Sequence, residues 1–291
     1  MASDSRPTHA NQSQDLDDVT TRTRTYYDAP DVDTVYRKLW GGTTINIGLY
    51  HDPRDPIALA SQRTIEAIAS LTGPITAESR IIDLGAGYGG AARYLAHTYG
   101  CHVTCINLSG IQNERNKELC KQEGLEHLVT VLEGSFEYIP VPDNSFDIVW
   151  SQDAFVHSGD REKVVMEIDR ILVIKGGTVV FTDPMERAGV PREQLKGVLG
   201  RLPVERLGSV PFYQRTFRKR GFFSKGFRNW SEDMRSHYGR VLQELEQWER
   251  KKDADDGIGK AFIDNMKVGL RAWVEGTRKG DLVWGCSVFY R

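Results

Sequence analysis

The stretch Arg80-Ile-Ile-Asp-Leu-Gly-Ala-Gly-Tyr-Gly-Gly90 decides the fold of this chain. An apolar run, Ile81-Ile82, leads to Asp83, glycines follow at positions 85, 87, 89 and 90, and a helical pattern begins at Ala91. This order predicts a buried strand, a tight turn and the N-terminus of a helix. Glycines let a ligand approach the backbone, and the free N–H groups at a helix start suit a polar or anionic group. The turn is typical of a nucleotide-like cofactor site.

The glycine turn fits more than one cofactor. Gly85, Gly87 and Gly90 satisfy the dinucleotide fingerprint G-x-G-x-x-G. Asp83, however, stands two residues before the first glycine, where a carboxylate suits the ammonium of S-adenosylmethionine and would repel a pyrophosphate. The turn also follows a long polar and aromatic leader, whereas dinucleotide domains often open with it. We therefore favour S-adenosylmethionine, with an NAD(P)-linked oxidoreductase and a non-catalytic binding or scaffolding module as alternatives.

Strands and helices alternate through the middle of the chain. We predict strands at 80–84, 102–107, 129–132, 146–151 and 178–183, and helices at 58–71, 89–99, 110–123 and 160–172. Apolar, β-branched strands joined by helices predict an α/β fold with a doubly wound, mostly parallel sheet. Two further strands, 222–230 and 282–290, bring the sheet to seven, with the last pair antiparallel. Helices are expected at 210–220, 231–252 and 259–279.

The bulk composition indicates a soluble globular protein. Its 291 residues are 40% hydrophobic and carry a net charge of −2, so no global field attracts nucleic acid or a membrane. No run approaches the roughly eighteen apolar residues of a membrane span. Four cysteines form no C-x-x-C pair, and we interpret them as buried hydrophobes in a reducing compartment. We expect a cytoplasmic monomer or dimer without a metal site.

The chain is expected to divide into a tail and one domain. Residues 1–22 are polar, lack the apolar core of a secretion signal and are predicted to be disordered. Residues 23–291 are predicted to form one domain that binds S-adenosylmethionine. Within it, a lid is expected at about 23–75, and helical cap insertions at about 186–210 and 231–280.

Polar side chains follow the predicted strands where a ligand should bind, beyond the carboxyl ends of a doubly wound sheet. Asn107 ends the second strand, where an acidic residue would normally hold the ribose, and an amide can still donate and accept. Ser135 and Phe136 follow the third strand, where the adenine should lie. Turn, capping and core roles are the alternatives for these three residues.

Asp153 and His157 follow the fourth strand and are four residues apart, so they share a face if this segment is helical. An acid beside an imidazole suits general-base chemistry or orientation of an amine, although a lone histidine also serves as a structural hydrogen bonder. Aromatic residues of the leader could close over the site and hold a methylated ammonium by cation–π attraction, worth ~0.5–2 kcal/mol each. They are Tyr26, Tyr27, Tyr36, Trp40 and Tyr50.

Several segments resemble the sarcosine/dimethylglycine N-methyltransferases. They are Ile-Asp-Leu-Gly-Ala-Gly-Tyr-Gly-Gly-Ala-Ala-Arg (82–93), Trp-Ser-Gln-Asp-Ala-Phe-Val-His-Ser (150–158), Thr-Asp-Pro-Met (182–185), Ser-His-Tyr (236–238) and Leu-x-Trp-Gly (282–285). The resemblance runs from about Tyr26 to the C-terminus. It implies an enzyme that methylates sarcosine and dimethylglycine to glycine betaine, an osmoprotectant, using S-adenosylmethionine and no metal. Asn107 is no departure, because related sequences carry Asn there.

The resemblance also implies roles for individual residues. A weaker likeness to phosphobase N-methyltransferases adds Tyr27 to Asp153 and His157 as catalytic residues, and makes phosphoethanolamine or another small amine the alternative substrate. The expected cofactor-binding residues are Tyr27, Ile45, Asp83, Gly85, Ala86, Gly87, Asn107, Leu108, Gln112, Ser135, Phe136 and Gln152. The expected substrate-binding residues are Trp40, Asp153, His157, Tyr213, Arg215, His237 and Tyr238. Several of these, and Arg206, could hold a substrate carboxylate, and the sequence does not choose among them.

Overall fold

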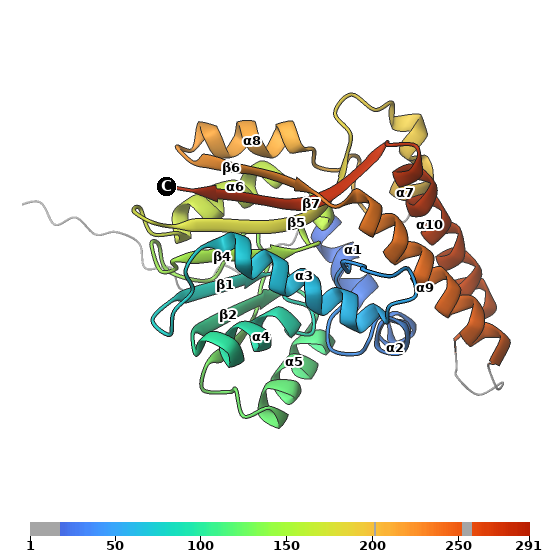
Figure 1. Ribbon diagram of the computed structural model, residues 1–291, viewed down its shortest axis with the longest axis horizontal. Coiled ribbons are helices and arrows are strands. Elements are labelled where there is room, and N and C mark those ends of the chain that lie inside the picture. The colour runs from blue at the N-terminus through green and yellow to red at the C-terminus, as the bar shows by residue number, and fades with distance from the viewer. Residues whose placement is uncertain (1–17, 201, 252–257) are drawn as a thin grey trace, which may run out of the picture.

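The computed structural model describes residues 18–200, 202–251 and 258–291. Within them, seven strands form one sheet in the order β3-β2-β1-β4-β5-β7-β6 (Figure 1). Neighbouring strands are parallel except for β7, which is antiparallel to both β5 and β6. The prediction of a doubly wound, mostly parallel sheet is therefore confirmed. The strands are β1 (Arg80–Leu84), β2 (His102–Asn107), β3 (Val129–Glu133), β4 (Ile148–Gln152), β5 (Thr178–Glu186), β6 (Phe223–Asn229) and β7 (Leu282–Tyr290).

Helices cover both faces of the sheet, each over its own apolar core. On one face, Ile65 and Leu95 pack with Ile81 and other strand residues. On the opposite face, Val165 and Phe217 belong to a second core. The first face carries α3 (Ile57–Thr72), α4 (Gly90–Tyr99) and α5 (Gly110–Gln122), and the second carries α6 (Arg161–Ile171) and α8 (Val210–Lys219).

The remaining helices gather beyond one end of the sheet, where α9 and α10 lie side by side (Figure 1). A third core joins them to α2 through Val35, Val241, Leu245 and Leu270. The predicted helices at 231–252 and 259–279 are thus confirmed. These elements are α1 (Asp18–Tyr27), α2 (Pro30–Leu39), η1 (Phe155–His157), η2 (Arg192–Leu195), α7 (Lys196–Leu199), α9 (Ser231–Lys251) and α10 (Lys260–Arg278).

The N-terminal segment differs from its prediction. Helix α1 begins at Asp18, and Thr20 and Thr23 on it are buried, so residues 18–22 do not belong to a disordered tail. Residues 1–17 lie outside the described residues. The aromatic leader also forms α2, which starts at Pro30 and has acidic residues in its first turn and basic ones in its last. Both features favour a helix, because proline suits a first turn and these charges oppose the helix dipole.

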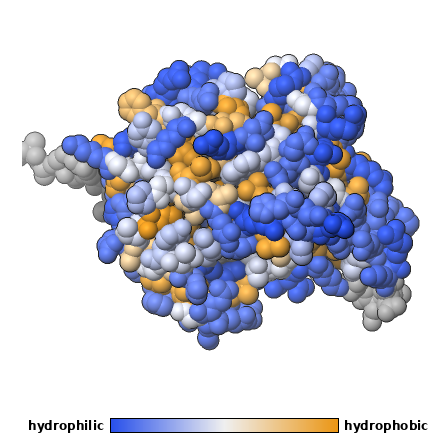
Figure 2. All heavy atoms as spheres, in the orientation of Figure 1, coloured by the Kyte–Doolittle hydropathy of each residue, from blue (hydrophilic) through white to orange (hydrophobic). Residues whose placement is uncertain are grey.

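Hydrophilic side chains dominate the face seen in Figure 2, and hydrophobic ones appear mainly between α3 and the β6–β7 edge. No helix in the described part of the chain is long and apolar enough to span a bilayer. The cysteines Cys101, Cys105, Cys120 and Cys286 are free and buried, as predicted. Burial is consistent with their role as small core residues.

Candidate active site

The glycine turn after β1 requires its glycines. Gly85 has a φ of 79°, and a Cβ there would lie 2.3 Å from the Cβ of Ala154. Gly89 has a φ of 71°, and a Cβ there would lie 2.0 Å from Oδ1 of Asn116. A side chain at either position would meet both a strained backbone and an occupied space. The turn consequently brings bare backbone to the carboxyl ends of β1 and β4.

A cavity opens beside this turn, which we call the glycine-loop cavity. Nine of the predicted cofactor-binding residues line it: Tyr27, Ile45, Gly85, Gly87, Asn107, Leu108, Gln112, Phe136 and Gln152. The amide of Asn107 donates to Oε1 of Gln112 at 3.0 Å, which joins the end of β2 to α5. Apolar walls from Ile45 and Phe136 suit an adenine, and the amides suit ribose hydroxyls.

Three predicted cofactor-binding residues do not line this cavity. Ala86 and Asp83 are absent from its wall. Ser135 is 3% exposed, and its hydroxyl accepts a hydrogen bond from the N–H of Glu137 at 3.1 Å. The side chain of Ser135 therefore stabilises its own turn, and the structure gives no support for its contact with adenine.

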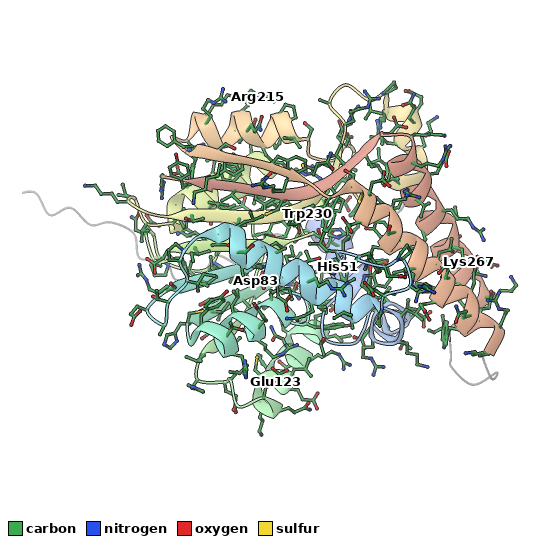
Figure 3. The ribbon with its side chains drawn as sticks, viewed as in Figure 1. His51, Asp83, Glu123, Arg215, Trp230 and Lys267 are labelled. Carbon is green, nitrogen blue, oxygen red and sulfur yellow. The ribbon has the colours of Figure 1, made fainter. Side chains whose placement is uncertain are left out.

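Asp83 provides the clearest test of the cofactor's chemistry. It is 2% exposed, lies near the centre of the fold (Figure 3), and burial raises the pKa of its carboxyl to about 7. Among the described residues, no cation or hydrogen-bond donor pairs with this carboxylate. An unpaired buried charge is costly, so the site is incomplete without a cationic partner. The ammonium group of S-adenosylmethionine fits this requirement.

A second cavity of about 310 Å³ adjoins the first, and we call it the aromatic cavity. Six aromatic side chains line it: Tyr26, Tyr27, Tyr36, Trp40, Tyr238 and Trp273. Tyr36 and Trp40 are 4.7 Å apart between ring centroids, and Tyr238 stacks on Trp273 at 5.2 Å. Such walls attract alkylated ammonium groups by cation–π interaction.

Asp153, His157 and Tyr27 line both cavities and so mark their junction. Burial raises the pKa of Asp153 to about 6 and lowers that of His157 to about 4. At neutral pH the pair is therefore a carboxylate beside a neutral imidazole. Both forms accept a proton.

The prediction that Asp153 and His157 share one face of a helix is wrong. Asp153 has a φ of 56°, in the left-handed region, and only the 3-10 turn η1 follows it. This turn instead places both residues on the walls of the two cavities. His157 forms a 2.8 Å hydrogen bond from Nε2 to the hydroxyl of Tyr27, which links η1 to α1.

Three predicted substrate-binding residues do not line the aromatic cavity. Tyr213 is in the core, where its hydroxyl donates to Asp183 at 2.8 Å. Arg215 is exposed on the outer side of α8 (Figure 3), because the apolar face of that helix packs on the sheet. His237 is fully buried and accepts a hydrogen bond from the N–H of Gly48. Arg206, a further expected carboxylate partner, pairs with Glu186 instead.

Arg22 is a lining residue that the sequence did not single out. It is the only lysine or arginine among the described residues that line the aromatic cavity, and it pairs with Asp18 at 3.4 Å. It was missed because residues 1–22 were interpreted as tail. No group of three or more potential metal-ligating side chains occurs in residues 18–200, 202–251 and 258–291.

The sheet order, the glycine turn and the buried carboxylate before it define a class I S-adenosylmethionine-dependent methyltransferase. A family model described as a methyltransferase domain matches residues 82–181. The chain belongs to the family of sarcosine/dimethylglycine N-methyltransferases. It is 44% identical over 267 residues to the sarcosine/dimethylglycine N-methyltransferase of Halorhodospira halochloris, covering 92% of this chain and 94% of that protein.

Two further relatives support this membership. The glycine/sarcosine/dimethylglycine N-methyltransferase of Actinopolyspora halophila is 49% identical over 90% of this chain, and the chain spans 46% of its length, about half. A crystal structure assigned as a sarcosine dimethylglycine methyltransferase from Galdieria sulphuraria superposes with a TM-score of 0.82 at 38% identity. That match covers 89% of this chain and 97% of the other.

Proposed function

We propose that this protein methylates the nitrogen of sarcosine and of dimethylglycine, giving glycine betaine. The observation that carries the proposal is the junction formed by Asp153, His157 and Tyr27 between the glycine-loop cavity and the aromatic cavity. A donor in one cavity and an amine in the other would meet there. The names of the relatives described above support the same substrates.

The residues of the glycine-loop cavity, together with the buried Asp83 before the glycine turn, suit S-adenosylmethionine. Asp83 would pair with its ammonium, Asn107 and Gln112 would bind its ribose, and Phe136 would cover its adenine. Bound there, this cofactor supplies an electrophilic methyl group. Holding the amine close to that group, in a fixed orientation, is the main contribution expected from the protein.

Asp153 is proposed to take the proton of the substrate amine. Secondary and tertiary amino acids arrive as ammonium ions at neutral pH, so their lone pair must first be freed. The Asp153 carboxylate is ionised above about pH 6 and can accept this proton. His157 stays neutral and holds Tyr27, so we assign it to closing the junction and orienting the amine.

The aromatic cavity is proposed to hold the substrate's methylated nitrogen through Trp40 and Tyr238. Arg22 would bind the single carboxylate at the cavity wall. One arginine among the described lining residues suits a carboxylate better than a phosphate dianion, which favours an amino acid over phosphoethanolamine.

We also propose that the segment before β1 acts as a lid. Asp28 accepts a hydrogen bond from the hydroxyl of Ser109 at 2.6 Å, and Arg24 pairs with Glu133 at 2.7 Å. These contacts attach α1 to the ends of β2 and β3 beside the glycine-loop cavity. Opening them would uncover both cavities together.

Transfer of a labelled methyl group to sarcosine, dimethylglycine, glycine and phosphoethanolamine, measured in parallel, tests the proposed function. We expect turnover of sarcosine and dimethylglycine to exceed that of phosphoethanolamine by at least about a hundredfold, or roughly 2.7 kcal/mol. Preference for phosphoethanolamine would replace this proposal with the phosphobase alternative.

A further inference from the structure

Asp153 is held in an unfavourable backbone conformation. It directly follows β4, with a φ of 56°. Residues other than glycine seldom adopt this region, and such strain persists only where surrounding contacts enforce it. The N–H of Asp153 donates to the carbonyl of Thr182 at 2.9 Å, which fixes the turn against β5. The carboxylate consequently lies on the wall of both cavities.

Three donors from three separate segments hold the Asp153 carboxylate. The backbone N–H of Ile47 donates to Oδ2 at 2.8 Å. The hydroxyl of Thr182 donates to Oδ1 at 2.9 Å, and the indole N–H of Trp284 donates to the same oxygen at 2.7 Å. Thr182 and Trp284 are both fully buried. Since an indole N–H can only donate, it favours the ionised carboxylate over the acid.

The surroundings of Asp153 otherwise oppose ionisation. The buried carboxyl of Asp183 lies nearby on β5 and repels a second negative charge. Burial lowers the pKa of His157 and of His237, so both are uncharged at neutral pH, and Arg161 on α6 acts on Asp183 and His157. Burial raises the pKa of Asp153, and the three donors counteract that rise. Loss of any of these donors would therefore raise the pKa of Asp153 further.

We propose that Trp284 and Thr182 are positioning residues that keep the Asp153 carboxylate ionised and aimed at the cavity junction. The inference rests on the proposed function, because it requires Asp153 to accept the proton of the amine. In that step the ammonium N–H bond breaks, the proton passes to a carboxylate oxygen, and the lone pair stays on nitrogen. Neither Trp284 nor Thr182 lines either cavity, so both act through Asp153.

The test is the pH dependence of kcat/KM for sarcosine in matched variants. Trp284→Phe keeps an aromatic ring but loses the donor, and Thr182→Val keeps the shape of threonine but loses the hydroxyl. Each change should move the acidic limb of the profile upward by about one pH unit or more, since a hydrogen bond to a charged group is lost. Activity on the alkaline plateau should stay within about threefold of the parent. Thr182→Ser should restore the parent profile.

Trp230→Phe is the control, because Trp230 (labelled in Figure 3) packs against Trp284 with ring centroids 5.7 Å apart. The donors to the Asp153 carboxylate are instead Ile47, Thr182 and Trp284. The acidic limb of the pH profile of Trp230→Phe should not move. An acidic limb unchanged in Trp284→Phe and Thr182→Val, or a loss of activity equal at every pH, overturns the inference. If Trp284→Phe does not fold, the two Thr182 variants decide. Failure of the parent enzyme to methylate sarcosine would instead refute the proposed function.

Discussion

The hydroxyl of Tyr27 on α1 and Nε2 of His157 on η1 lie 2.8 Å apart and share a hydrogen bond across 130 residues of sequence. Their rings meet edge to face, with centroids 5.3 Å apart. Because both residues line both cavities, this bond joins α1 to η1 at the junction where we propose that methyl transfer occurs.

Tyr27→Phe should lower kcat/KM for sarcosine by about three- to tenfold, the equivalent of one hydrogen bond between neutral groups. Since burial holds the pKa of His157 near 4, the loss should be the same from pH 6 to pH 9. Combining Tyr27→Phe with His157→Ala should cost no more than His157→Ala alone. Steady-state kinetics of the three variants measure this, and additive losses would show that the two residues act separately.

Asp83 should make cofactor affinity depend on pH. Burial raises the pKa of its carboxyl to about 7, so in the free protein it holds a proton below that pH. The ammonium of S-adenosylhomocysteine requires the ionised form, so its Kd should rise by up to about tenfold for each pH unit below 7 and stay level above. Titration calorimetry between pH 5.5 and 8.5 measures this dependence.

Asp83→Asn supplies the matched control for that titration. It should weaken binding at pH 8 and remove the pH dependence below 7. When the pKa of a carboxyl is higher in the folded protein than in the unfolded one, the protein loses stability as the pH rises through the folded-state pKa. The ligand-free Asn variant should therefore unfold at a higher temperature than the parent at pH 8. Pronounced pH dependence that survives in Asp83→Asn would locate the titrating group elsewhere.

Gly85→Ala and Gly124→Ala separate backbone strain from loss of space. Both glycines have positive φ, 79° and 70°, but only Gly85 has a neighbour, the Cβ of Ala154, in the way of a side chain. Gly124→Ala should cost about 1–2 kcal/mol of stability and leave binding of S-adenosylhomocysteine unchanged. Gly85→Ala should cost more and abolish the thermal stabilisation by that ligand. If S-adenosylhomocysteine raised the melting temperature of both variants equally in a thermal shift experiment, the packing described for the glycine turn after β1 would be contradicted.

Arg22→Gln should raise the KM for sarcosine by about tenfold or more, since a charge-assisted bond to the substrate carboxylate is lost, and should change kcat little. Arg37→Gln on α2 is the control, because Arg37 pairs with Asp33 and does not line the aromatic cavity. Saturation curves for sarcosine measure both variants. A similar KM in the two would remove Arg22 from the binding of the carboxylate.

The sequence predicted the central part of the fold well, because its signals are local. A strand, Gly85 to Gly90 and a helix follow one another within about twenty residues, and strand alternation continues to Asp183. Asp153 and His157 were also found, since polar residues at the carboxyl end of a buried strand are conspicuous. Their arrangement was wrong because the left-handed backbone at Asp153 is enforced by distant residues, with no local pattern to indicate it.

The rest of the site depends on contacts between segments far apart in sequence. The indole N–H of Trp284 donates a hydrogen bond to Asp153, which is 131 residues away in the sequence. No rule based on residue spacing predicts this contact. Arg22 was hidden in a polar segment that forms a helix only against the sheet and its neighbours. Arg215 shows the reverse error, since it was expected among the substrate-binding residues, whereas the amphipathic packing of α8 turns it to solvent.

The most direct test of the account follows the conversion of unlabelled sarcosine by mass spectrometry, in the presence of S-adenosylmethionine labelled in its methyl group. We predict that dimethylglycine with one labelled methyl group appears first, that glycine betaine with two follows, and that Asp153→Asn slows both steps at least about a hundredfold. Consumption of the labelled donor without label in either product, or an Asp153→Asn variant as active as the parent, would contradict the account.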